Sequence, residues 1–163
     1  MAAADAREAR LLGILRRRFG HVSAERVLSG QGLVHLYRAI AEAEGRPAPA
    51  RDAAGITTHA LAGDCPASGA ALDAFCAMLG TLAGNVALTL GARGGVYLAG
   101  GMVPRFTGYL AGSSFRARFQ DKGRFGDYLA AIPTWAVVHP SPAFLGLLEM
   151  LRWTVSARSP GRS

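Results

Sequence analysis

Apolar residues recur at helical spacing along most of this chain, and the pattern predicts a helix-rich domain. The first helix is predicted over Ala6–Phe19 and ends at Gly20, since glycine suits the residue after a helix. The longest helix starts after Pro66 and runs to about Leu90, and its apolar stripe marks it as the central core helix. The stripe consists of Leu72, Phe75, Cys76, Leu79, Leu82, Ala83 and Val86, with Gly80 and Gly84 leaving room for a close neighbour.

Shorter helices are predicted between these two. Ser23 suits the N-cap of a helix that holds Glu25 in its first turn. Val22 and Val27 flank that turn at the positions of a hydrophobic staple. Residues 29–32 are predicted to form a turn, and residues 48–52 are predicted to form a proline-bearing surface loop. Thr57 or Thr58 is predicted to cap a further helix. The helix after the turn is predicted from the spacing of Leu33, Leu36, Tyr37 and Ile40.

Two short apolar runs predict strands. Residues 96–99 lie between two Gly-Gly pairs and are predicted to form a buried strand, and residues 135–138 form the second candidate. Pro104, then Ser113 or Ser114, open helices between the strands, and Pro142 opens a last one to about residue 155. Residues 156–163 are expected to be disordered. The fold class is therefore α/β, or helix-rich α+β. Two or three strands make a thin sheet for a core with this many apolar helices, so something else is expected to complete the sheet.

Composition limits the partners. With 163 residues and 50% hydrophobic content, the chain can build one domain with a core. A net charge of +7 raises the question of nucleic acid, but charged residues make up only 18% and the cations are mostly arginine, so a nucleic-acid role is disfavoured. No apolar run approaches the ~20 residues that span a bilayer, and no secretory signal opens the chain. Cys65 and Cys76 lack metal-type spacing, and two cysteines in a chain of this size do not suggest a disulfide scaffold, so a cytoplasmic protein with reduced thiols is expected.

The residues alone offer two candidate sites, each with a plainer alternative. A carboxylate fixed at a helix start, such as Glu25, can accept from two sugar hydroxyls, although the helix dipole favours it there in any case. The strand ending in Gly100 and Gly101 lets a flat ligand approach the backbone, or simply makes a tight turn. No P-loop motif is present. Metal binding is not predicted, because no close ligand spacing relates the four histidines, His21, His35, His59 and His139.

Three segments in one order carry a family resemblance. They are HVSAERVLSGQGLVHLYRAI from His21, GNVALTLGARGGVYLAGGMVPRF over residues 84–106, and FRARFQDKGRF over residues 115–125. Together they resemble bacterial glucokinase, a sugar kinase with the actin-like, ribonuclease-H-like fold. The resemblance implies that Glu25 bonds the hydroxyls of glucose and that Gly100, Gly101 and Met102 contact adenosine. It also implies ATP with Mg as cofactor, and glycolytic phosphorylation of glucose to glucose 6-phosphate as function.

The same resemblance shows what this sequence lacks. The family's Asp-Gly-Gly-Thr phosphate loop, its Asn-Asp pair with the catalytic base, its second glycine-rich loop and its Gly-Glu-Gly-Gly-His segment are absent. Residues 1–155 are therefore expected to form the C-terminal part of a glucokinase-like domain, with no catalytic residue of its own and no activity without an N-terminal half. Residues 142–155 are expected to pack on the small lobe, and a homodimer is expected by analogy. The alternatives are a non-catalytic sugar- or nucleotide-binding regulatory module and a truncated gene remnant.

Overall fold

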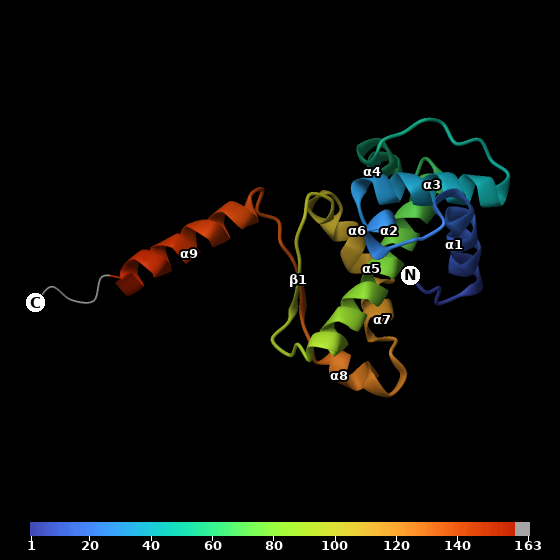
Figure 1. Cartoon of the computed structure of the whole chain (residues 1–163). Helices are drawn as coiled ribbons and strands as arrows, with labels where there is room; N and C mark the ends of the chain where they lie inside the picture. Colours follow the sequence, from blue (N-terminus) through green and yellow to red (C-terminus); the bar gives the residue numbers. More distant parts are fainter. Residues whose placement is uncertain (159–163) are drawn as a thin grey trace, which may run out of the picture.

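The structure is a computed structural model that describes residues 1–158, with side chains to residue 154. It is a helix-rich α/β fold, as predicted (Figure 1). The elements are α1 (Ala6–Phe19), α2 (Ala24–Val27), α3 (Gly30–Glu44), α4 (Ala53–Ala62), α5 (Pro66–Leu90), β1 (Val96–Leu98), η1 (Val103–Arg105), α6 (Thr107–Gly112), α7 (Phe115–Gln120), η2 (Gly123–Phe125), α8 (Gly126–Ala130), β2 (Thr134–Ala136) and α9 (Pro142–Arg158).

Helix α5 is the central core helix, as predicted, although Val86 of the predicted stripe is 44% exposed. It packs against α3, α4 and α7. A Cβ at Gly80 would lie 2.2 Å from the carbonyl oxygen of Phe115, and one at Gly84 would lie 2.4 Å from that of Phe119. The prediction that these glycines admit a close neighbour is therefore confirmed, and α7 is that neighbour.

The same helix corrects one sequence expectation. By length and composition α5 could cross a membrane, so the statement that no apolar run approaches that length was wrong. Its most apolar window is, however, 61% buried inside the protein. Burial of this kind is typical of the core helix of a folded domain, and the length of α5 is weak evidence for a membrane span.

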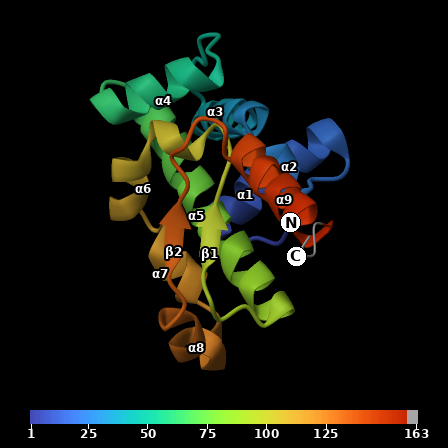
Figure 2. The same cartoon turned by 90° about the vertical axis from the view of Figure 1, so that its left-hand side faces the viewer.

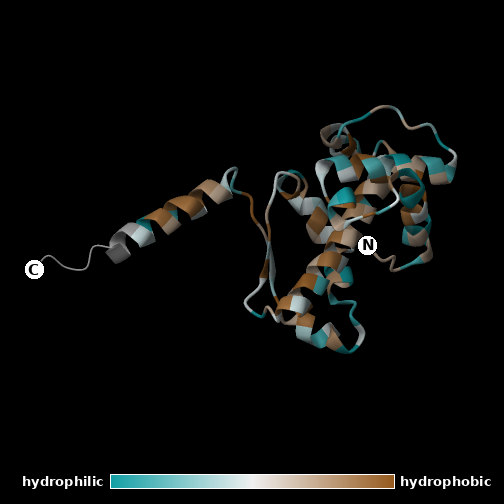
Figure 3. Cartoon of the chain, viewed as in Figure 1, coloured by the Kyte–Doolittle hydropathy of each residue, from teal (hydrophilic) through white to brown (hydrophobic). Residues whose placement is uncertain are grey.

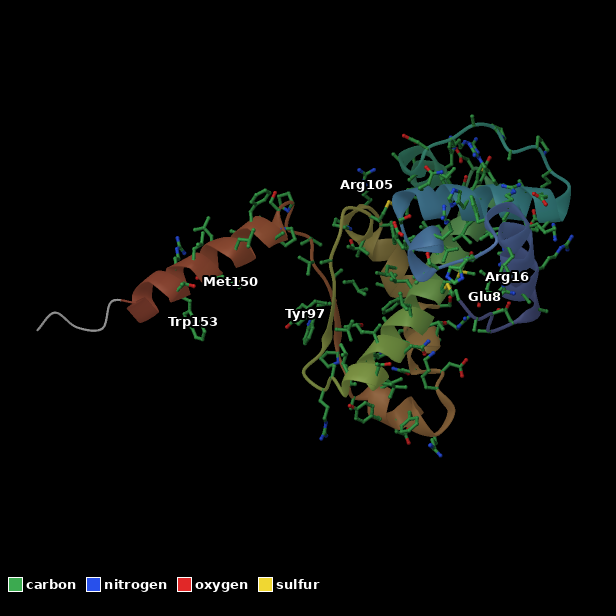
Figure 4. The ribbon with its side chains drawn as sticks, in the orientation of Figure 1. Glu8, Arg16, Tyr97, Arg105, Met150 and Trp153 are labelled. Carbon is green, nitrogen blue, oxygen red and sulfur yellow. The ribbon has the colours of Figure 1, made fainter. Side chains whose placement is uncertain are left out.

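A buried ion pair joins the first helix to the seventh. Glu8 on α1 is only 4% exposed, and its Oε1 lies 2.8 Å from a terminal nitrogen of Arg118 on α7. The Arg118 guanidinium also donates to the hydroxyl of Thr81 on α5, at 2.8 Å and 3.1 Å. The second Glu8 oxygen accepts from the backbone N–H of Ala4 at 2.8 Å. This cluster therefore ties α1, α5 and α7 together at one point, and Figure 4 labels Glu8.

The two strands form a parallel pair with one face open. Val96 pairs with Thr134, Tyr97 with Trp135 and Leu98 with Ala136 (Figure 2). The prediction of a buried strand was wrong, because only Leu98 is buried while Tyr97 is 66% exposed. The Tyr97 and Trp135 rings stack on that open face with centroids 4.7 Å apart. Parallel sheets are ordinarily covered on both faces, so this surface has the character of an interior.

Helix α9 extends away from the rest of the fold and carries an exposed apolar surface (Figures 1 and 3). It begins at Pro142 as predicted and is described to Arg158, so residues 156–158 are helical where disorder was expected. Residues 159–163 lie outside the described part. Figure 4 shows Met150 and Trp153 on this helix, 68% and 84% exposed. The other exposed apolar side chains are Phe144, Leu145, Leu147, Leu148 and Leu151.

Two local predictions were wrong because the helix caps lie elsewhere. Helix α3 starts at Gly30, where a turn was expected, because Ser29 Oγ accepts from the N–H of Gly32 at 3.0 Å and caps it. Helix α4 starts at Ala53, because Asp52 Oδ1 accepts from the N–H of Gly55 at 2.8 Å. The hydroxyl of Thr57 instead donates to the Ala53 carbonyl from inside the helix.

Candidate functional site

The exposed side chain of Glu25 lines a small polar hollow. Its helix, α2, is capped as predicted, with Ser23 Oγ accepting from the N–H of Arg26 at 3.2 Å. The predicted staple residues Val22 and Val27 are both buried, which fixes how the chain enters the helix. The exposed Glu25 side chain then lines a hollow of ≈ 240 Å³, whose other lining residues are Arg26, Ser29, Gln31 and His35.

The floor of this hollow is ordered by a set of contacts around His35. Its Nδ1 lies 3.2 Å from the carbonyl oxygen of Arg26, and its Nε2 lies 3.3 Å from Gln31 Nε2. Both contacts are satisfied when Nδ1 carries the proton and donates, and Nε2 accepts from the Gln31 amide. The ring of Phe19 packs 4.7 Å from the His35 ring, and the Arg26 guanidinium lies 4.6 Å from the Phe19 ring centroid. A carboxylate, an amide and an imidazole thus face one small space.

Sequence reasoning missed Gln31 and His35. Their signal is the i, i+4 spacing on α3, which places both side chains on one helix face. The predicted turn at residues 29–32 concealed it, because a turn would not align the two side chains.

A close approach of backbones fixes α2 against α3. A Cβ at Gly32 would lie 2.4 Å from the carbonyl carbon of Val27 and 2.5 Å from its oxygen. No side chain fits there, so glycine allows the end of α2 to rest directly on the first turn of α3. The position of Glu25 relative to Gln31 and His35 depends on this contact.

A larger groove lies on the other side of the first turn of α3. It has a volume of ≈ 770 Å³. Gly101 and Met102 line it, as does Gln31, which also lines the Glu25 hollow. The sulfur of Met102 lies 3.6 Å from the position that a Cβ of Gly30 would take, so the turn after β1 contacts the start of α3. The remaining lining residues are Gly30, Val34, Arg38, Ala50, Arg51, Asp52, Ala53, Ala54 and Arg105.

Gly100, the third predicted nucleotide contact, lies beside the groove. It lines an adjoining cavity of ≈ 400 Å³ between the turn after β1 and the segment after β2, together with Gly101, Arg105 and His139. The φ angle of Gly100 is 135°, a backbone conformation that residues other than glycine rarely adopt. The structure thus brings Glu25, Gly101 and Met102 together around one helix start.

Two aspartates outside the site pair with neighbouring side chains. Asp64 Oδ1 lies 2.8 Å from His59 Nδ1, and Asp73 accepts from the Tyr109 hydroxyl at 2.6 Å. Burial, together with Asp73, raises the pKa of Tyr109, so this phenol keeps its proton. Within residues 1–158, no three histidine, cysteine, aspartate or glutamate side chains gather in a way that could hold a metal ion.

Comparisons with known proteins agree on one family. The glucokinase family model matches residues 1–153. A glucokinase of Paramagnetospirillum magneticum is 58% identical over 151 residues, which cover 93% of this chain and 47% of the relative. A glucokinase of Shigella sonnei is 52% identical over 148 residues, which cover 91% and 46%. The chain therefore spans about half the length of the curated relatives that it matches.

Solved structures give the same result. A glucokinase from an Antarctic psychrotroph superposes with a TM-score of 0.81 at 41% identity, covering 86% of this chain and 44% of that one. A glucokinase from Balamuthia mandrillaris in complex with glucose gives a TM-score of 0.76 at 25% identity, covering 86% and 40%. The curated matches correspond to roughly the C-terminal half of those proteins, as the resemblance implied.

Proposed function

This chain belongs to the glucokinase family, and on that premise we propose that it supplies a sugar-binding carboxylate and the nucleotide groove of an ATP-dependent glucose kinase. The observation that carries the proposal is the adjacency of the two spaces. The Glu25 hollow and the groove at Gly101 and Met102 share Gln31 at the first turn of α3. A kinase needs its acceptor and its donor side by side, because positioning contributes most of phosphoryl transfer.

In this proposal Glu25 binds glucose. Its carboxylate accepts hydrogen bonds from two neighbouring hydroxyls, and charge-assisted bonds of this kind are the strong ones. The hollow also presents the amide of Gln31 and the ring of His35 to the sugar. A sugar is a dense array of donors and acceptors, so a small space lined by such groups suits it.

The nucleotide is proposed to lie along the turn after β1. Gly100 and Gly101 expose the backbone to a flat base, and Met102 provides an apolar surface beside it. Mg-ATP supplies the phosphoryl group, and the residues of this chain bind and orient the adenosine. The base that takes the proton from the sugar hydroxyl, and the phosphate loops, are proposed to come from an N-terminal half.

The open surfaces of this chain fit such a division. The exposed apolar side chains of α9 and the stacked rings of Tyr97 and Trp135 make surfaces that isolated domains rarely expose. We propose that an N-terminal half covers the open sheet face and that the small lobe packs on residues 142–155. A cytoplasmic location and a homodimer remain predictions from the family.

Recombination of two halves tests this proposal. The chain is co-expressed with the part of the Paramagnetospirillum magneticum glucokinase that precedes the matched region. Glucose 6-phosphate formation is then measured in a coupled dehydrogenase assay. We expect ATP-dependent activity in the mixture and none with either half alone. A mixture whose halves co-purify as a stable complex but form no glucose 6-phosphate would contradict the kinase function and favour a regulatory binding module.

A further inference from the structure

The groove has an uneven distribution of charge. Three arginines line it, Arg38, Arg51 and Arg105, against the single carboxylate of Asp52. Arg38 is on the same face of α3 as Gln31, because seven residues make two helical turns. Arg105 is the last residue of η1, in the segment after β1, and Figure 4 labels it. The arginines therefore come from three different segments around one space.

Two of these four charged groups are already engaged. The Arg51 guanidinium donates to the hydroxyl of Tyr37 and to the sulfur of Cys65, each at 3.1 Å. Asp52 caps α4 through the N–H of Gly55. Both side chains thus serve to shape the wall that precedes α4.

The two remaining arginines, Arg38 and Arg105, keep their charge available to a ligand. Both are exposed, and within residues 1–158 no carboxylate forms an ion pair with either guanidinium. An anionic ligand in the groove would meet two planar guanidinium groups, that of Arg38 from the middle of α3 and that of Arg105 from the end of η1. Guanidinium groups match phosphate oxygens in geometry and charge.

We infer that Arg38 and Arg105 hold the phosphate-bearing part of the nucleotide, so that the groove selects nucleoside phosphates over nucleosides. The inference rests on the proposed nucleotide groove and adds residues that the family motifs do not assign. Met102 lines the same groove as the two arginines, with its sulfur beside the start of α3. A base placed on Met102 therefore leaves its phosphates within a positively charged space.

Calorimetric titration of the whole chain in metal-free buffer tests the inference. The ligands are ADP, adenosine and inorganic tripolyphosphate, and the variants are Arg38→Gln, Arg105→Gln and the control Arg93→Gln, an exposed arginine outside the groove. We expect ADP to bind more tightly than adenosine. Each groove variant should lower ADP affinity by about tenfold and leave adenosine affinity unchanged. The control should bind as the parent does, and all variants should melt at the parent temperature.

The other outcomes overturn the inference in distinguishable ways. If the parent binds ADP and adenosine equally, or if both groove variants keep the preference for ADP, the arginines do not hold phosphate, while the nucleotide groove stands. If the chain binds neither ligand, the nucleotide groove itself is wrong and the inference falls with it. If tripolyphosphate binds as tightly as ADP, the arginines hold a bare phosphate chain and no nucleotide.

Discussion

Replacement of Gly32 by alanine should displace the helix that carries Glu25. The added Cβ would lie 2.4 Å, 2.5 Å and 2.8 Å from the carbonyl carbon, carbonyl oxygen and Cα of Val27. These atoms belong to backbone, so they cannot turn aside as the end of a flexible side chain could. Helix α2 must therefore move by about 1 Å to reach ordinary contact distances, and Glu25 moves with it.

The expected loss of stability follows from two opposing effects. Overpacking of this kind costs about 1–3 kcal/mol, while alanine in place of glycine within a helix contributes about 0.5–1 kcal/mol of stability. The difference is a net destabilisation of about 0–2.5 kcal/mol, centred near 1 kcal/mol. For a chain of this size, each kcal/mol shifts the melting temperature by about 2–4 °C, so the central expectation is a fall of about 2–4 °C.

A matched control lies two residues earlier on the same helix. A Cβ at Gly30 would meet nothing closer than the Met102 sulfur at 3.6 Å, which is an ordinary contact. Gly30→Ala should therefore melt at the parent temperature or slightly above it. In the recombined enzyme, Gly32→Ala should raise the KM for glucose on the order of tenfold, because a displacement of about 1 Å disturbs the contact. Equal melting temperatures and equal KM values for the two variants would refute the reasoning.

Three further outcomes are expected. Ser29→Ala removes the cap of α3 and should lower the free energy of unfolding in urea by about 1 kcal/mol; an unchanged midpoint would show that the cap bond contributes nothing. Glu8→Ala removes the nearer ion-pair partner of the largely buried Arg118 and leaves it only Asp5, at 3.8 Å, so the variant should lose about 3 kcal/mol of stability. Glu8→Leu combined with Arg118→Met should recover much of this loss; a double variant less stable than Glu8→Ala would contradict the reasoning. Iodoacetamide at pH 7.5 should label Cys65 well before Cys76, as measured by peptide mass spectrometry. Burial raises the pKa of Cys76 to about 11, whereas the Ser68 hydroxyl and the Arg51 guanidinium lower the pKa of Cys65. Equal labelling rates for the two cysteines would contradict this difference between their environments.

Sequence reasoning succeeded where one local signal decided the structure. Gly20 ends α1 because glycine readily takes the positive φ needed after a helix, and Pro66 starts α5 because proline fits the first turn of a helix and not its interior. It failed at Asp52 and Ser29, where several capping residues lie close together and only packing selects among them. Thr57 has the composition of a cap, yet its hydroxyl is used within the helix.

The strands and the site show a different limit. Residues 96–99 have the composition of a buried strand, yet the face of the sheet that carries Tyr97 is open. Whether that face is covered depends on neighbouring elements, and the sequence of one segment does not reveal them. For the site, Glu25 and Met102 came from family resemblance. Gln31, which joins the two spaces, was missed because it has no motif and gains its place only when α3 begins at Gly30.

The most direct test of the central claim is the steady-state kinetics of Glu25→Gln in the recombined enzyme. Gln keeps the shape of the side chain and removes the charge that accepts from two sugar hydroxyls. We predict that kcat/KM for glucose falls by about tenfold to a hundredfold while the KM for ATP stays at the parent value. An unchanged kcat/KM for glucose would contradict the account, because the hollow at Glu25 would then lie outside the sugar site.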